Sequence, residues 1–159
     1  MKFNIQLFAD STLTPKTSMK TKLSYATTLS GQKTDVGYVQ SIPALKSPAD
    51  PITYGALDLE EEQSAKGTRK AETLTIPILF TETQHDAIQA LVTAETEVFW
   101  FVQYPEATAS QTGKPLTFYF TGTCDLSNEA IEIDGMLQEN ITIYRSSQVM
   151  ESKGYPVEE

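Results

Sequence analysis

Apolar and polar positions follow their clearest pattern between Glu97 and Tyr104, where the sequence predicts an extended strand. Side chains of a strand point alternately to its two faces. One face of this strand carries Val98, Trp100, Val102 and Tyr104, and the other carries Phe99 and Phe101. Because both faces are apolar, we expect cover on both sides, as in a sandwich or beneath a helix.

The segment before this strand has the spacing of a short amphipathic helix over residues 81–93. Its apolar side chains recur at intervals of three or four residues, which places them on one helical face. The pattern Thr81-x-x-Gln84 is typical of a capping box at a helix start. We expect this helix to pack on the aromatic strand and form a core hub of Ile88, Leu91, Val92, Phe99, Trp100 and Phe101.

Further strands are predicted on both sides of this hub. Alternation is seen over Thr34–Ile42, and over Ala71–Phe80, where Pro77 indicates an edge strand or a bulge. In Leu116–Leu126 the pattern places Leu116 inward and Thr117 outward. Asp134-Gly135 lies between Ala130–Asp134 and Met136–Tyr144 and predicts a tight hairpin. The fold class is therefore mainly β, a sandwich or barrel-like core with one flanking helix.

The length of 159 residues favours one domain with flanking segments. Residues 1–30 are polar and read as an N-terminal arm or lead-in, with a short strand at Lys20–Tyr25. Residues 31–145 contain the β pattern, and residues 146–159 read as a loose acidic tail. Three prolines between positions 43 and 51 begin a long charged loop that we place at residues 43–70.

Charge and chemistry exclude several classes of function. The formal net charge is −9, which argues against nucleic-acid binding through clustered basic side chains. The single cysteine, Cys124, cannot form an intrachain disulfide, and the single histidine, His85, is interpreted as structural. The pattern shows neither a catalytic constellation nor a metal or cofactor motif. We expect a protein that is not an enzyme and has no apolar run long enough to span a membrane.

The long loop changes sign along its length. Acidic residues come first and basic residues follow, namely Asp58, Glu60, Glu61 and Glu62, then Lys66, Arg69 and Lys70. One interpretation is a solvated loop or hairpin tip. The other is an intermolecular contact, in which this dipolar segment orders against a neighbouring copy.

The order of these elements resembles the major tail tube protein of long-tailed, siphovirus-like bacteriophages. The resemblance is carried by Ile52-Thr53-Tyr54-Gly55 with the Glu60–Lys70 loop, Leu74–Phe80, the Glu82–Thr93 helix and the Asn128–Tyr144 hairpin. The opening Lys2–Ala9 is similar to that of many phage structural proteins. The resemblance to the tail tube family implies a subunit that closes into six-membered rings, which stack into a β-lined tube.

This resemblance also implies partners and sites. The partners are further copies of the chain, a tape measure protein inside the tube, and the tail tip or baseplate and tail terminator proteins, all in the virion tail after assembly in the host cytoplasm. DNA passes without specific binding, along an acidic lumen to which we assign Glu132, Asp134 and Glu139. The charged residues of the long loop are assigned to contacts between rings.

Two alternatives remain open at this point. One is a phage ring protein that does not polymerise, such as a tail terminator or connector. The other is an Ig-like domain that binds carbohydrate or a cell surface, which would need an exposed aromatic platform. The central position of Trp100 in its strand favours a core role instead.

Overall fold

The computed structural model describes residues 18–55, 61–105 and 114–156. In these ranges one helix and nine strands follow one another along the chain. Their order is β1 (Lys22–Ala26), β2 (Thr34–Val36), β3 (Pro51–Tyr54), β4 (Gln63–Lys66), β5 (Leu74–Leu79), α1 (Glu82–Thr93), β6 (Val98–Gln103), β7 (Leu116–Asn128), β8 (Gln138–Arg145) and β9 (Met150–Lys153).

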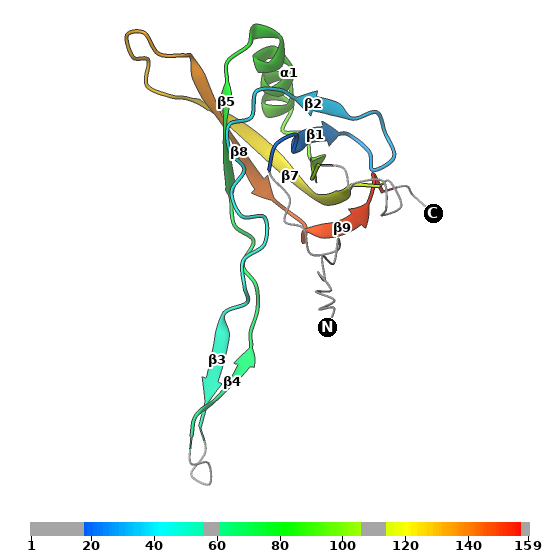
Figure 1. Cartoon of the computed structure of the whole chain (residues 1–159), viewed down its shortest axis with the longest axis vertical. Helices are drawn as coiled ribbons and strands as arrows, with labels where there is room; N and C mark the ends of the chain where they lie inside the picture. The colour runs from blue at the N-terminus through cyan, green and yellow to red at the C-terminus, as the bar shows by residue number, and fades with distance from the viewer. Residues whose placement is uncertain (1–17, 56–60, 106–113, 157–159) are drawn as a thin grey trace, which may run out of the picture.

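Seven strands form one antiparallel sheet, which curls into half a barrel (Figure 1). The order is β2-β1-β6-β7-β8-β5, and β9 also pairs with β7. One edge of β7 pairs with β6, while its other edge pairs with β9 at the start and β8 at the end. The predicted mainly β, barrel-like fold with one helix is confirmed, and β5 lies at the sheet edge that Pro77 predicts.

Strand β7 changes partner near Gly122. A Cβ atom at this position would lie 2.5 Å from the backbone oxygen of Tyr144 on β8. The missing side chain therefore allows the two backbones to approach closely. The indole nitrogen of Trp100 donates a hydrogen bond of 3.3 Å to the Gly122 carbonyl oxygen, which joins the central strand to this point.

Both faces of β6 are covered, as its apolar pattern predicts. On one face Trp100 packs with Tyr25 at 5.6 Å between ring centroids and belongs to the same core cluster as Ile88 of α1. On the other face Phe101 is fully buried, with the ring of Tyr155 at 5.7 Å and edge-on. Trp100 and Phe101 thus pack into two separate layers of side chains, one on each face of β6.

The helix begins and ends where its periodicity predicts, but the expected capping box is not formed. Thr81 makes no capping hydrogen bond through its side chain. The Gln84 amide instead accepts a hydrogen bond from the Gly37 N–H at 2.9 Å and donates one to the Gly37 carbonyl at 3.3 Å. Gln84 therefore ties the helix to the chain after β2, a contact that spans 47 positions of sequence.

Three predicted boundaries are wrong. Strand β2 ends at Val36, because the chain bends at Gly37 and Tyr38 takes a positive φ of 55°. Residues 130–134 are not a strand, since the β7 ladder ends at Asn128 and a loop follows. The segment from Met150 to Lys153 is not a loose tail, because it pairs with β7 as β9.

The start of β7 also differs from its predicted orientation. Leu116 is 36% exposed, whereas Thr117 is completely buried. Thr117 lies on the same covered face of the sheet as Phe101, whereas the sequence pattern placed Thr117 outward. The lead-in likewise contributes to the sheet, since β1 pairs with both β2 and β6 near the predicted short strand. Residues 1–17 lie outside the described ranges.

Candidate functional site

The most prominent surface is a two-stranded arm formed by β3 and β4, which projects far from the half-barrel (Figure 1). The two strands pair from Pro51 with Lys66 to Tyr54 with Gln63. Every residue of both strands is exposed, including Ile52 at 57% and Tyr54 at 50%. The long charged loop expected at 43–70 therefore contains a two-stranded β-ribbon, in agreement with the hairpin interpretation of its charged segment. A ribbon of this kind is marginal alone in water.

The charged residues assigned to ring stacking are divided along this arm. Asp58 and Glu60 lie outside the described residues. Glu61 and Glu62 are exposed just before β4, toward the outer end. The three basic residues, Lys66, Arg69 and Lys70, lie toward the root, where Lys70 pairs with Asp50 at 3.3 Å.

A basic pocket lies at the root of the arm. Its volume is about 530 Å³, and its lining includes five cationic side chains, namely Lys46, Lys66, Arg69, Lys70 and Arg145. The whole chain has 12 Lys and Arg against 21 Asp and Glu. Positive charge is therefore concentrated here, although the protein as a whole is acidic.

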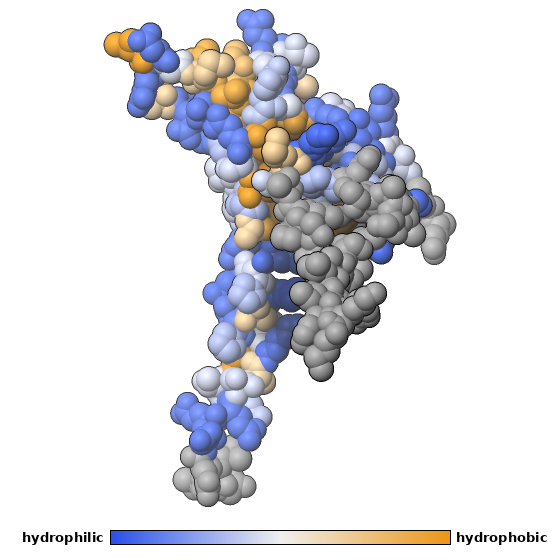
Figure 2. All heavy atoms as spheres, in the orientation of Figure 1, coloured by the Kyte–Doolittle hydropathy of each residue, from blue (hydrophilic) through white to orange (hydrophobic). Residues whose placement is uncertain are grey.

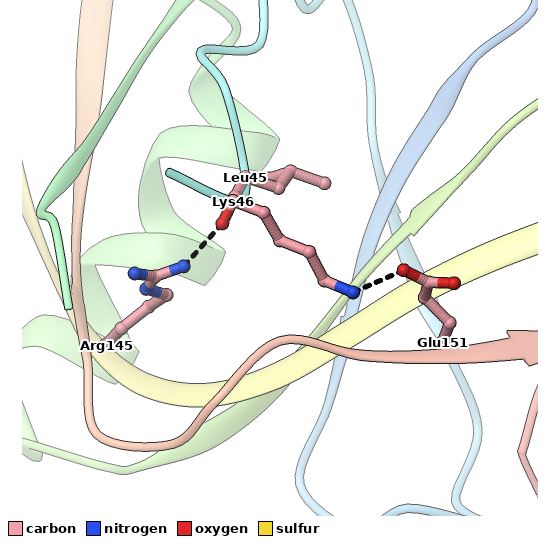
Figure 3. A network of polar contacts seen from close by, with 4 residues as sticks. All are labelled: Leu45, Lys46, Arg145 and Glu151. Atoms are coloured by element: carbon pink, nitrogen blue, oxygen red, sulfur yellow. Dashed lines mark hydrogen bonds and ion pairs between the residues drawn. The ribbon is translucent and has the colours of Figure 1, made fainter. Parts of the chain in front are cut away.

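Two of these cations hold the pocket wall together (Figure 3). The Arg145 guanidinium donates a hydrogen bond from Nη1 to the Leu45 carbonyl at 2.6 Å. Its Nε is buried and has no hydrogen-bond partner among the described residues. Lys46 forms an ion pair with Glu151 and lies over the Phe118 ring, with Nζ 5.5 Å from its centroid.

An apolar pocket adjoins the basic pocket. Its volume is about 690 Å³, and its apolar lining includes Val39, Ile42, Leu45, Val102 and Tyr104. Leu45 lines both pockets, so the two form neighbouring parts of one surface.

A second projection, which we call the tip, is the loop Glu129–Leu137 between β7 and β8 (Figure 1). All of its residues are exposed. Its large apolar side chains are visible in the space-filling view (Figure 2) and are exposed by 82% for Ile131, 95% for Ile133, 72% for Met136 and 50% for Leu137. Exposed apolar residues gathered at one projecting point indicate a contact surface.

The tip has a defined backbone. Asp134 takes a positive φ of 64°, and the Gly135 N–H donates a hydrogen bond of 3.3 Å to the Glu132 carbonyl. At its base the N–H groups of Glu129 and Phe80 donate to the carbonyls of Gln138 and Leu137, at 3.2 and 2.9 Å. The Asp134-Gly135 pair thus makes a turn, within a longer loop than the predicted two-residue hairpin.

The three residues assigned to an acidic lumen are in different environments. Glu139 is only 4% exposed, and its Oε1 lies 2.8 Å from Nδ1 of His85. It is therefore removed from the set of lumen residues, because β8 turns its side chain toward the helix. Glu132 and Asp134 are exposed but alternate with Ile131 and Ile133, an arrangement that favours a protein contact over a water-filled wall.

The remaining residues singled out by sequence lie in the interior. In the core hub Ile88, Trp100 and Phe101 are fully buried, while Leu91, Val92 and Phe99 are partly buried. Burial raises the pKa of the Cys124 thiol to about 11, which disfavours a reactive thiolate. Trp100 has no exposed surface and cannot provide the aromatic platform that a carbohydrate-binding domain would need.

The described residues contain no cluster of three or more His, Cys, Asp or Glu side chains arranged to hold a metal ion. Within the same ranges, no helix is both long enough and apolar enough to cross a membrane. The main features of the described surface are the arm, the tip and the two pockets.

Comparison with known proteins identifies a shared fold. No protein-family model matches the chain, and no curated protein matches it. The structure is similar to a chain in the cryo-EM structure of the anti-feeding prophage (AFP) baseplate, 6-fold symmetrised. The TM-score is 0.61 with 6% sequence identity, over 91% of this chain and 99% of that chain. At this identity the likeness establishes the common fold, which is found in a component of a phage-derived particle.

Proposed function

We propose that this protein is a structural subunit of a phage tail-type particle, in which copies of the chain form six-membered rings. The fold shared with a component of a six-fold symmetrised baseplate supports this class. The exposed apolar side chains on two projecting elements, the arm and the tip, are consistent with assembly.

The observation that carries the proposal is the arm. A hairpin that buries none of its residues against its own chain gains little from folding outward, unless another molecule covers it. It presents exposed side chains of Ile52 and Tyr54 together with Glu61 and Glu62. Such a ribbon offers backbone edges for strand addition and side chains for specificity. We assign it to the contact between successive rings.

Stacked rings would form a tail tube, with an acidic channel through which DNA passes. The net charge of −9 per chain supports low adhesion of DNA, because phosphates are repelled by a negative surface. A second candidate is a ring that does not polymerise, such as a baseplate layer, connector or tail terminator. The likeness to a baseplate chain favours this candidate specifically.

Electron microscopy of the purified full-length chain tests these alternatives. We expect hollow tubes with a regular axial repeat after concentration, viewed by negative stain and accompanied by light-scattering mass. Closed single rings at every concentration would select the non-polymerising candidate. A chain that stays monomeric at the highest attainable concentration would contradict unaided self-assembly.

A further inference from the structure

The tip and the two pockets are complementary in chemical character. The tip combines large exposed apolar side chains, led by Ile131 and Ile133, with the carboxylates of Glu132 and Asp134. The pockets combine an apolar lining with cationic side chains and meet at Leu45. An apolar projection with negative charge thus matches an apolar recess beside positive charge.

Within one chain the tip is directed away from the basic pocket. The tip begins where the β7–β8 pairing ends, and Arg145 of the basic pocket lies at the opposite end of β8. With a rise of about 3.3 Å per residue, the two ends of β8 are separated by roughly 23 Å. The base of the tip is fixed by the backbone hydrogen bonds of Glu129 and Phe80. A contact between the tip and the basic pocket must therefore join two different copies.

We propose that the tip of each subunit inserts into the paired pockets of its neighbour and forms the lateral contact of the ring. Ile131 and Ile133 enter the apolar pocket, while Glu132 and Asp134 face Lys66 and Arg69. Because the two surfaces differ, the contact is heterologous and repeats around a closed ring. The inference rests on the proposed function, and it identifies the surfaces that this function requires.

Lys66 and Arg69 are suited to this role because both are exposed and neither is paired with a carboxylate of another described residue. Lys46 and Lys70 are already paired with Glu151 and Asp50, and Arg145 is bonded to the Leu45 carbonyl. Two cations of the basic pocket are thus available for carboxylates from outside.

Exchange of charges between full-length variants tests the proposal. The first variant carries Glu132→Lys with Asp134→Lys, and the second carries Lys66→Glu with Arg69→Glu. Each variant alone places like charges in contact, so we expect association weakened by at least about tenfold, which corresponds to about 1.4 kcal/mol. An equimolar mixture should recover association, because every contact then joins opposite charges.

The composition of the recovered oligomer is a specific readout. In a closed ring the two variants must alternate, so native mass spectrometry should show hetero-oligomers with equal numbers of each. A control variant with Asp35→Lys and Asp125→Lys has the same change in net charge at exposed positions elsewhere and should assemble like the unmodified chain. The variants should also retain the native emission of Trp100, since all substituted side chains are exposed.

Several outcomes would overturn the proposal. Normal assembly of either charge variant alone would exclude this contact, even if tubes form and the proposed function stands. A mixture that remains dissociated while the unmodified chain assembles would do the same. Conversely, rings that require matched tip and pocket charges but never stack would support the contact and contradict the tube. If the unmodified chain remains monomeric up to millimolar concentration, the lateral contact and self-assembly both fail.

Discussion

His85 and Glu139 form a polar contact between α1 and the start of β8, just after the tip. The ring of His85 also lies 5.6 Å from that of Phe80, so it is held between the helix start and the end of β5. Glu139 is buried, and its Oε2 has no hydrogen-bond partner among the described residues. His85 is therefore the main polar partner that compensates for burial of this carboxylate.

Substitution His85→Ala should destabilise the fold by about 1–3 kcal/mol, because a buried carboxylate loses its partner. The quantity to measure is the free energy of unfolding in urea, followed by Trp100 fluorescence. Replacing both partners, with His85→Leu and Glu139→Met, should recover much of the loss. A single variant as stable as the unmodified chain would show that water satisfies Glu139 equally well.

Cys124 predicts a pH dependence of stability. Its pKa is raised by burial from an ordinary value of 9.0 to about 11. The unfolded thiol ionises first as the pH rises, so the stabilising contribution is complete below pH 9 and is lost between about 9 and 11. Urea midpoints of the unmodified chain should fall relative to those of Cys124→Ala over this interval. Parallel curves for the two proteins would contradict the assignment.

At the scale of elements, the arm and the tip are hairpins with different support. The tip continues the β7–β8 ladder of the main sheet, so its base is fixed by the fold. The arm is a separate two-stranded sheet, held at its root by backbone hydrogen bonds between Asp50 and its neighbours Gly67 and Thr68, at 2.8 and 3.2 Å. The arm can therefore be shortened without removing any strand of the half-barrel.

Replacement of residues 53–64 by Asn-Gly should abolish stacking of rings while preserving the folded subunit. The two-residue turn suits a hairpin, and the substitution retains Lys66 and Arg69 of the basic pocket. Electron microscopy should show single rings in place of tubes, with an unchanged unfolding free energy of the half-barrel. A full-length arm carrying Thr53→Ser is the matched control. Tubes of normal repeat from the shortened chain would exclude the arm from stacking.

At the scale of the whole molecule, the tip, the basic pocket and the arm lie in different parts of the subunit, which is therefore asymmetric. The tip and the basic pocket are associated with opposite ends of β8, while the arm extends away from the half-barrel (Figure 1). A subunit with different complementary surfaces forms rings or filaments, in contrast to a symmetric dimer. This polarity is what both the proposed ring contact and the proposed stacking contact would require.

Prediction from sequence was most accurate where local periodicity coincided with burial. Helix α1 lies within one residue of the predicted start, because its apolar spacing also defines the face that covers the core. Strands β5 and β6 were found for the same reason. The tip was misassigned, since Ile131 and Ile133 alternate like strand residues although no neighbouring strand pairs with them. The available signal in the sequence was the Asp134-Gly135 pair directly after isoleucines that alternate with carboxylates.

The sequence by itself determined the mainly β fold, the single helix, the double-sided central strand and the acidic charge, because these depend on residue type and nearest-neighbour periodicity. Only the tertiary structure decided that Glu139 is buried against His85, that Gln84 binds Gly37, and that cations from three separate segments form one pocket. The partners in these contacts are far apart in the sequence, with separations of 54 positions for His85 and Glu139, 47 for Gln84 and Gly37, and up to about 100 across the pocket. Local patterns do not show which residues so far apart in the sequence lie close in space. The curl of the sheet brings these residues together.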